Sequence, residues 1–170
     1  DPDTVSLSNL QRQIMHGTPD LGRPKSLSAR DSMLRSNPLI TVEPIIGSLT
    51  PENAAEIIGR YDLTLDCTDN LATRLLINDT CVETGKPYVF GAVRRFGGQV
   101  FTHIPGSAGY RDIFGGEANE ESDVPCAVDG VLNTMVGVTG ALQATEAVKY
   151  LAGTGDLLTD RILVMDAITM

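Results

Sequence analysis

The sequence lacks three features that would each assign it to a broad class of protein. No apolar run approaches the roughly 18 residues that a membrane span needs, and the chain does not open with the charged and apolar segments of a signal peptide. Basic residues are in deficit, since 13 Lys and Arg stand against 22 Asp and Glu and give a net charge of -9. A nucleic-acid-binding face needs an excess of cations to neutralise phosphates. We therefore expect a soluble, cytoplasmic protein that binds neither membranes nor nucleic acids.

Cysteine is also scarce. The three cysteines, Cys67, Cys81 and Cys126, are an odd number without a CxxC spacing. This pattern favours free thiols in a reducing compartment over a disulfide framework. Free cysteines are usually small buried residues, which is the interpretation expected for Cys81 and Cys67. Cys126 lies in a stretch rich in Gly and acids, where an inert thiol and a reactive nucleophile or persulfide carrier both stay open.

What the sequence does contain is an alternation of helix-like and strand-like stretches in 170 residues, enough for one domain with a core. Turn and capping residues predict helices over 25–37, 50–61, 71–85 and 132–153, and strands over 39–46, 62–67, 87–93, 97–104 and 161–167. Small residues recur at helical intervals in 132–153 and predict close packing of that helix on a sheet or another helix. The order predicts an α/β fold with a Rossmann-like, mainly parallel sheet flanked by helices, and an antiparallel portion after residue 93.

The polar run S-L-S-N-L-Q-R-Q (6–13) places a hydroxyl, two amides and a guanidinium within five residues: Ser8, Asn9, Gln11 and Arg12. An Arg fork with neutral donors suits phosphate oxygens, and Lys25 adds a cation a short loop later. A solvated helix-capping turn is the alternative interpretation, and it stays open.

The stretch D-C-T-D-N (66–70) follows a predicted strand, at the end of a parallel sheet where ligands bind. A helix cap at Asp69 or Asn70 would explain one acid but not two. A carboxylate facing a phosphate site would repel it unless a divalent cation bridged the two, so we interpret Asp69 as a magnesium ligand and Asp66 as structural. The two glycine-containing stretches that approach nucleotide-binding motifs, 17–26 and 137–142, match neither the Walker A loop nor G-x-G-x-x-G.

Four stretches together carry a family resemblance: DPDTVSLSNLQRQ (1–13), GRPK (22–25), LDCTDN with a following TR (65–74), and VTGALQATEAVKYLAG (138–153). In order and spacing they resemble the ThiF/MoeB family of ubiquitin-activating-type adenylyltransferases, nearest to its MoeZ-like branch. The resemblance implies adenylation, with ATP and Mg²⁺, of the C-terminal Gly-Gly carboxylate of a ubiquitin-fold sulfur-carrier protein. It also implies a homodimer, and leaves open whether the pathway is molybdenum cofactor biosynthesis or another sulfur transfer.

The resemblance also implies site residues. Asp1 would hold the ribose, Lys25 would stabilise charge on the α-phosphate, Asp69 would bind magnesium with Asn70 beside it, and Cys126 would react covalently with the carrier or its sulfur. The phosphates would be held by Ser8, Asn9, Gln11 and Arg12. The catalytic set is then Arg12, Lys25, Asp69 and Cys126.

The sequence departs from the family pattern in two places. The family's glycine-rich nucleotide loop would precede Asp1, so we expect 1–170 to be one nucleotide-binding domain truncated at both ends and inactive by itself. The zinc motif C-Y-R-C reads G-Y-R-D at 109–112, so a four-thiolate zinc site is not expected. Two alternatives stay open, a catalytically silent scaffold or partner subunit of the same family and, with less support, an NAD-dependent oxidoreductase.

Overall fold

A computed structural model of the chain describes residues 1–115 and 130–169. The chain divides into two units, Asp1–Leu49 and Thr50–Met170. Within the described ranges, no helix combines the length and the apolar character that crossing a membrane requires.

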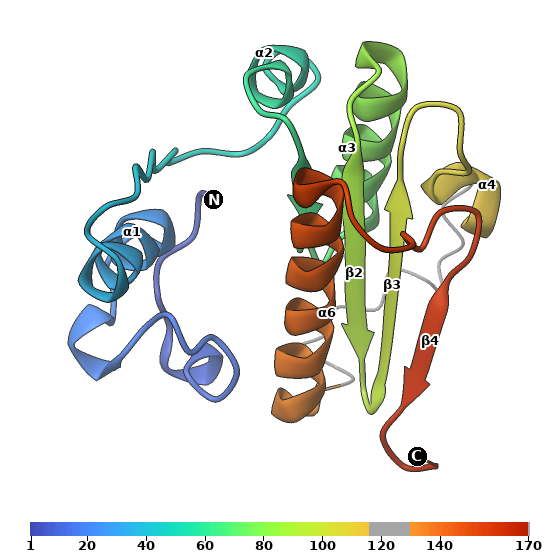
Figure 1. Cartoon of the computed structure of the whole chain (residues 1–170). Coiled ribbons are helices and arrows are strands. Elements are labelled where there is room, and N and C mark those ends of the chain that lie inside the picture. Colours follow the sequence, from blue (N-terminus) through green and yellow to red (C-terminus); the bar gives the residue numbers. More distant parts are fainter. Residues whose placement is uncertain (116–129, 170) are drawn as a thin grey trace. The chain divides into compact units, whose positions relative to one another are not determined.

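The first unit is built on helix α1 (Lys25–Ser36), preceded by the short 3₁₀ helices η1 (Leu7–Asn9) and η2 (Thr18–Asp20) (Figure 1). The predicted helix over 25–37 is confirmed to within a residue, with Pro24 at the N-cap. Val5 joins the start of the chain to the segment before α1, since its amide donates to the Arg23 carbonyl (2.9 Å) and its carbonyl accepts from the Gly22 amide (2.9 Å).

The strand predicted over 39–46 is wrong, because this stretch is irregular in the structure. Its β-branched composition favours extended backbone, but a strand also needs a neighbour for its backbone groups. Here Ile45 accepts a single bond at its carbonyl, from the Asp1 amino group (3.1 Å). Pro44 has no N–H to offer a partner strand.

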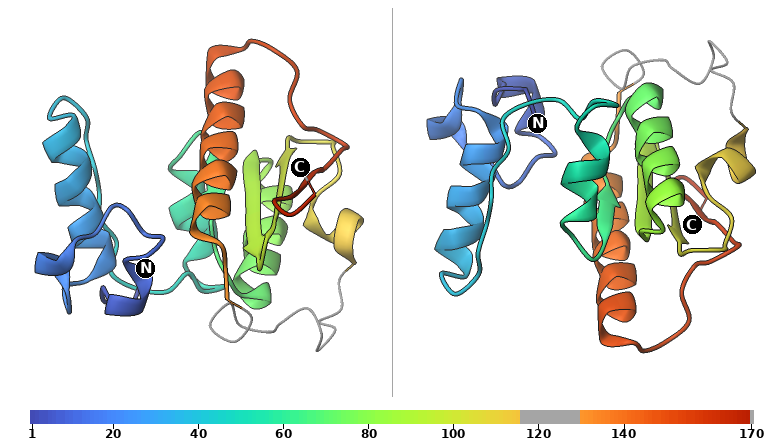
Figure 2. Two further views of the ribbon diagram at one scale, coloured as in Figure 1. Left: turned by 90° about the horizontal axis from the view of Figure 1, so that it is seen from below. Right: turned by 90° about the horizontal axis from the view of Figure 1, so that it is seen from above.

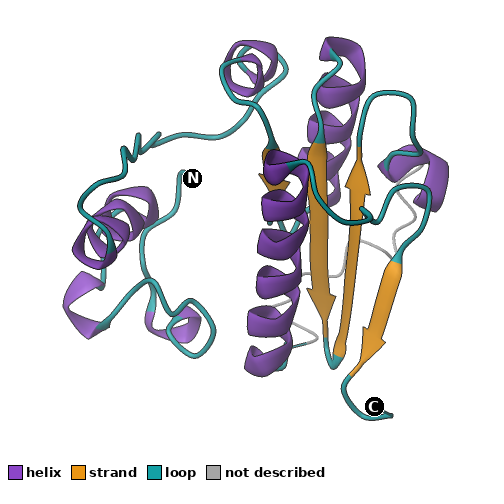
Figure 3. Cartoon of the chain, viewed as in Figure 1, coloured by secondary structure: helices purple, strands orange, loops and turns teal. Residues whose placement is uncertain are grey.

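The second unit contains a four-stranded sheet in the order β1-β2-β3-β4 (Figure 3). Its strands are β1 (Thr64–Asp66), β2 (Tyr88–Arg94), β3 (Gly97–His103) and β4 (Leu163–Asp166). β1 runs parallel to β2 with Asp66 opposite Phe90, whereas β2–β3 and β3–β4 are antiparallel. The α/β class and the antiparallel portion after residue 93 are confirmed, and the parallel part of the described sheet is the β1–β2 pair.

Four helices of the second unit are described: α2 (Ala54–Gly59), α3 (Leu71–Thr84), α4 (Tyr110–Phe114) and α6 (Asn133–Ala152). The helix predicted from residue 50 begins at Ala54, after a turn. α3 ends as predicted at Gly85, whose φ of 64° is the left-handed conformation that glycine adopts without strain.

The helices cover both faces of the sheet. α6 lies on one side of the strands and α4 on the other in both views of Figure 2. Because side chains alternate along a strand, successive residues of β2 face opposite sides. Phe90 stacks on Phe101 and meets Tyr110 of α4 edge-on, while Gly91 faces α6. The core therefore has an aromatic side under α4 and a second side under α6.

The small residues of α6 do not form its buried face. Of the five, only Ala147 is buried, while Gly137, Gly140, Ala141 and Ala144 are exposed in the described unit. The prediction that they pack the helix closely on the sheet is wrong, because the space there comes from glycines of the sheet; that they pack on another helix stays a prediction. A Cβ at Gly91 would lie 2.1 Å from Gln143 Cδ, and one at Gly98 would lie 2.5 Å from Thr139 Oγ1. The buried face of α6 comprises Met135, Thr139, Gln143, Glu146 and Ala147.

Candidate functional site

The turn at residues 66–70 leads from the carboxyl end of β1 into α3. Asp66 is 1% exposed and its Oδ1 accepts hydrogen bonds from the Thr68 amide (2.9 Å) and the Thr68 hydroxyl (2.7 Å). Burial raises the pKa of Asp66, against the opposing effects of these bonds and of the Arg74 charge. Asp66 therefore shapes the turn, in agreement with the structural role predicted for it.

The two other polar residues of the turn have separate positions. Asn70 is the N-cap of α3, where its Oδ1 accepts from the Thr73 amide (2.8 Å), so the capping interpretation is confirmed for Asn70. Asp69 precedes the cap and is exposed, and within the described ranges its carboxylate forms no hydrogen bond or ion pair. Asp69 is thus available to a ligand, while the amide oxygen of Asn70 is already used.

The neighbours that hold this turn were not predicted from the sequence. Gln143 of α6 donates through Nε2 to the Asp66 carbonyl (2.8 Å), and Arg74 of α3 donates through Nη2 to the Thr68 carbonyl (2.9 Å). The Arg74 guanidinium also lies 5.6 Å from the centre of the Phe90 ring. The contact of Arg74 could be predicted locally, because a side chain in the first helical turn of α3 lies near the segment 66–70. Nothing near Gln143 in the sequence indicates its contact with that segment.

The turn offers a magnesium ion few protein ligands. The described residues hold no group of three or more His, Cys, Asp or Glu side chains suited to a metal ion. Magnesium is commonly bound by one or two carboxylates together with water and substrate phosphates, and not by a cage of protein ligands. A single free carboxylate such as Asp69 fits that mode, in which the nucleotide supplies the other ligands.

In the first unit, Lys25 lies beside the start of the chain. Its Nζ donates to the Asp3 carboxylate (2.7 Å), and its amide donates to the Asp3 carbonyl (2.9 Å). The Asp1 carboxylate in turn accepts from the Asp3 amide (2.8 Å). The structure therefore brings Asp1 and Lys25 together through Asp3, a residue for which the sequence predicted no role.

The other predicted phosphate-binding residues share one compact turn around η1. The Arg12 amide donates to the Asn9 carbonyl (3.1 Å) and Arg12 Nη1 to the Ser8 carbonyl (3.3 Å). Ser8 and Gln11 are exposed, and Asn9 and Arg12 are partly exposed. The predicted residues thus form two groups, one in each unit.

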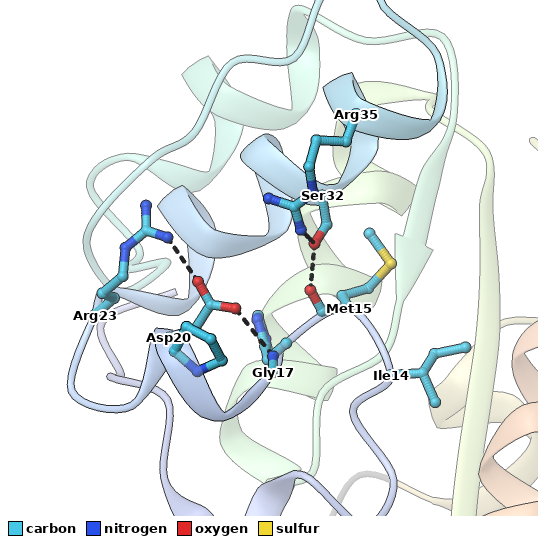
Figure 4. Close-up of a pocket in the computed structure, with 9 residues that line it drawn as sticks. Ile14, Met15, Gly17, Asp20, Arg23, Ser32 and Arg35 are labelled. Carbon is cyan, nitrogen blue, oxygen red and sulfur yellow. Dashed lines mark hydrogen bonds and ion pairs between the residues drawn. The ribbon is translucent and has the colours of Figure 1, made fainter.

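An open pocket of about 470 Å³ lies beside α1 in the first unit. Asp20 links the Gly17 amide and Arg23 at one side, and Ser32 links the Met15 carbonyl and Arg35 at the other (Figure 4). The complete lining is Ile14, Met15, His16, Gly17, Pro19, Asp20, Arg23, Ser32 and Arg35. No residue predicted to bind nucleotide is among these, so the pocket gives no support to that prediction.

The cysteines divide differently from the prediction. Cys81 is fully buried in α3, and burial raises the pKa of its thiol to about 11, which confirms an inert thiol. Cys67 is exposed, so its expected burial is wrong: it follows β1 at the surface end of the turn. The pKa of Cys67 is raised first by desolvation from surrounding protein atoms and then by the Asp66 charge. A contact to Gln143 Oε1 (3.7 Å) lowers it. Cys126 lies outside the described residues.

The G-Y-R-D stretch begins helix α4. The Asp112 carboxylate accepts from the Gly109 amide (2.8 Å) and so caps the helix at the two positions where the family's zinc motif has cysteines. Asn78 Oδ1 accepts from the Tyr110 amide (2.7 Å) and the Tyr88 hydroxyl (2.9 Å), which ties α4 to α3. Polar contacts hold α4 in place here, and the absence of a zinc site stays a prediction.

The fold and the acidic turn define an α/β protein of the Rossmann-like class. Solved structures agree: that of Escherichia coli MccB with succinimide superposes with a TM-score of 0.82 at 18% identity, over 100% of this chain and 53% of that chain. At this identity the likeness shows the fold alone. The chain belongs to the ThiF family, whose profile matches residues 1–170, so the predicted resemblance is confirmed.

Several curated relatives are closer in sequence. The probable adenylyltransferase/sulfurtransferase MoeZ of Mycobacterium tuberculosis is 46% identical over 176 residues, covering 100% of this chain and 45% of that protein. Molybdopterin-synthase adenylyltransferase of Escherichia coli is 44% identical over 174 residues, with coverage of 99% and 68%. Sulfur carrier protein adenylyltransferase of Thermus thermophilus is 43% identical over 172 residues, with coverage of 98% and 64%. The chain spans about half to two thirds of the length of these relatives.

Proposed function

We propose that the protein containing this chain uses ATP and Mg²⁺ to adenylate the C-terminal glycine carboxylate of a ubiquitin-fold sulfur-carrier protein. Membership of the ThiF family and the names of the relatives, among them a molybdopterin-synthase adenylyltransferase and a sulfur carrier protein adenylyltransferase, support this reaction. The structural observation that carries it is the free carboxylate of Asp69 on a fixed turn at the carboxyl end of β1.

The chemistry explains the residue types. A carrier carboxylate oxygen attacks the α-phosphorus of ATP, the bond from that phosphorus to the bridging oxygen breaks, and pyrophosphate leaves with the bond's electrons. Two anions must approach each other, so cations have to be fixed beforehand. Arg12 and Lys25 supply positive charge, Ser8, Asn9 and Gln11 supply neutral donors, and Asp1 accepts from the ribose hydroxyls. Asp69, with Asn70 beside it, would hold magnesium, which would neutralise charge on the phosphates.

The Lys25–Asp3 ion pair refines the role of Lys25. An ammonium group has three N–H donors, and the bond to Asp3 uses one of them. The Lys25 side chain is 13% exposed, so its freedom is already restricted before a nucleotide binds. We propose that Asp3 holds the lysine in place while its two other donors serve the α-phosphate.

The proposal is tested by exchange of labelled pyrophosphate into ATP, with the full-length protein and a panel of ubiquitin-fold carriers that end in Gly-Gly. Replacing Asp69→Asn removes the charge at constant size and should lower carrier-dependent exchange on the order of 100-fold, as for loss of a group that stabilises charge in the transition state. Asp62→Asn is the matched control: Asp62 is an exposed acid at the opposite end of β1, and its replacement should leave exchange unchanged. Equal exchange by the Asp69→Asn variant and the wild type would reject the proposal.

Three further points are tested separately: catalytic silence, the role of Cys126 and the oligomeric state. A catalytically silent relative would show no exchange with any carrier, and calorimetry with ATP and Mg²⁺ would then show whether it still binds the nucleotide. Cys126 is proposed, from the family resemblance, to take the carrier or its sulfur covalently. Replacing Cys126→Ser should abolish a covalent adduct that an excess of added thiol releases, without lowering pyrophosphate exchange, since adenylation precedes that step. A homodimer is likewise proposed and is measurable by sedimentation.

A further inference from the structure

Hydrogen bonds from several directions hold the residues around Asp69 in the turn at 66–70. The Asp69 carboxylate itself is not hydrogen-bonded within the described residues. The Asp66 carboxylate bonds to Thr68 inside the turn, Arg74 bonds to the Thr68 carbonyl from α3, and the Asn70 side chain caps α3. All of these contacts lie within residues 66–74. They hold its conformation but do not fix its position on the sheet.

Gln143 supplies the long-range contact. It lies 77 residues from Asp66 in sequence and is 4% exposed. Its Nε2 donates to the Asp66 carbonyl (2.8 Å) at the end of β1 and to the Val89 carbonyl (3.3 Å) of the adjacent strand. Its Oε1 accepts from Cys67 Sγ (3.7 Å). One amide therefore joins β1, β2 and Cys67 of the turn to α6.

Gly91 makes the space for this amide. An added Cβ on Gly91 would lie 2.1 Å from Gln143 Cδ and 2.3 Å from Oε1, closer than real side chains approach. Gly91 is buried and lies two residues after Val89 on β2, so it faces the same side of the sheet. The amide of Gln143 thus occupies the volume of a missing side chain over the centre of the sheet.

We infer that Gln143 is a positioning residue for Asp69. Its amide, in the space left by Gly91, fixes the turn at 66–70 relative to the sheet and so fixes the position of the free Asp69 carboxylate. The consequence for magnesium and ATP rests on the proposed function, whereas the restraint of the turn does not. Groups that hold a metal ligand in place typically contribute 10- to 100-fold to metal affinity or activity.

The test uses the full-length protein with the substitution Gln143→Met, which keeps the length and volume of the side chain. The substitution removes both the amide N–H donor and the amide oxygen acceptor. The control is Thr139→Val, one turn earlier on the same buried face of α6. Thr139 Oγ1 is buried without a hydrogen-bond partner within the described ranges, so this control alters the helix packing without touching the turn. A second variant, Arg74→Met, weakens the turn from the partly exposed side and covers the case in which Gln143→Met does not fold.

The first measurement is hydrogen exchange of the amides at 67–70, which needs neither nucleotide nor carrier. Both Gln143→Met and Arg74→Met should speed exchange at the Thr68 amide at least tenfold relative to the wild type and to Thr139→Val. Unchanged exchange at Thr68 in a folded Gln143→Met variant would overturn the inference. Faster exchange throughout α6 and the sheet, in the control as well, would also overturn it, since it would mean that the residue only stabilises the fold.

The second measurement is calorimetric titration of ATP at a series of Mg²⁺ concentrations. Gln143→Met should raise the Mg²⁺ concentration for half-maximal ATP binding about tenfold, whereas Thr139→Val should not change it. If the wild type binds no ATP at any Mg²⁺ concentration, the proposed function fails and the restraint of the turn is still decided by hydrogen exchange. If the wild type binds ATP and Gln143→Met keeps the same Mg²⁺ midpoint, the inference fails and the proposed function stands.

Discussion

Glu146 of α6 offers a sharp test of how the second unit is held together. It is 3% exposed, and its Oε2 accepts from the Thr102 hydroxyl of β3 (2.6 Å) and the Leu158 amide (2.8 Å). Its Oε1 pairs with Lys149 one turn later. This carboxylate therefore ties α6, the sheet and the segment that leads to β4 to one another.

The magnitude follows from these partners. Removing one partner of a buried, hydrogen-bonded ion pair costs about 3–5 kcal/mol, because the remaining groups lose their acceptor away from water. We expect Glu146→Ala to lower the free energy of unfolding by that amount. Glu146→Gln keeps an acceptor for Thr102 and Leu158 but loses the charge opposite Lys149, so about half of that loss is expected. Urea unfolding at pH 7, followed by circular dichroism, measures both.

The same group predicts a pH dependence. Burial alone would raise the pKa of Glu146, but bonds from Lys149, Thr102 and the Leu158 amide lower it below its ordinary value of 4.5. A lowered folded-state pKa means that the stabilisation is complete above about pH 4.5 and is lost as the pH falls through the folded value. The stability difference between wild type and Glu146→Gln should therefore shrink below pH 4.5. A difference that stays constant from pH 7 to pH 3, or a Glu146→Ala loss below about 1 kcal/mol at pH 7, would refute this account.

Two further predictions concern α3. Replacing Asn78→Ala should lower the free energy of unfolding by about 2–3 kcal/mol, since it removes a buried acceptor of two hydrogen bonds. Asp79→Ala should cost less than about 1 kcal/mol, because its pair with Arg111 is exposed. Urea unfolding that ranks the two variants in the opposite order would contradict this. At pH 8, iodoacetamide should modify Cys81 only when the protein unfolds, because the thiol is buried and its pKa is about 11. Cys67 should react before Cys81 but more slowly than free cysteine, and mass spectrometry of the digested protein would show a failure of that order.

Features with a local cause could be predicted from the sequence. Helix α3 begins after Asn70 and ends at Gly85, because a side-chain cap and a left-handed glycine act within one turn of the chain. The β2–β3 hairpin follows similarly from the short connection between two strand-like stretches. The segment 39–46 is richer in β-branched residues than either stretch and is not a strand. What separates the two cases is a paired neighbour, which composition does not report.

The burial of individual side chains was harder to predict. Cys67 has the residue type of a packed thiol, and its exposure follows from its place one residue beyond the end of β1. The small residues of α6 suggested a close approach, but Gly91 and Gly98 provide it from the sheet, so the helix can carry Gln143 and Thr139 on its buried face. A close approach needs small residues on one partner only, and the sequence of the helix does not say which partner has them.

The five residues of the candidate site also combine features that have a local cause with a position that depends on a distant contact. That D-C-T-D-N contains a cap and an available acid could be predicted, because both follow from what comes immediately before and after it. Which acid is available depends on how far β1 extends: Asp66 is still paired opposite Phe90 and is buried, whereas Asp69, three residues on, is beyond the sheet. The contact that would keep Asp69 there comes from Gln143, 77 residues away, and exists only because α6 crosses the sheet at Gly91. An acid at a strand end can thus be found from sequence. Its fixed position depends on a helix whose own sequence does not indicate the contact with the turn.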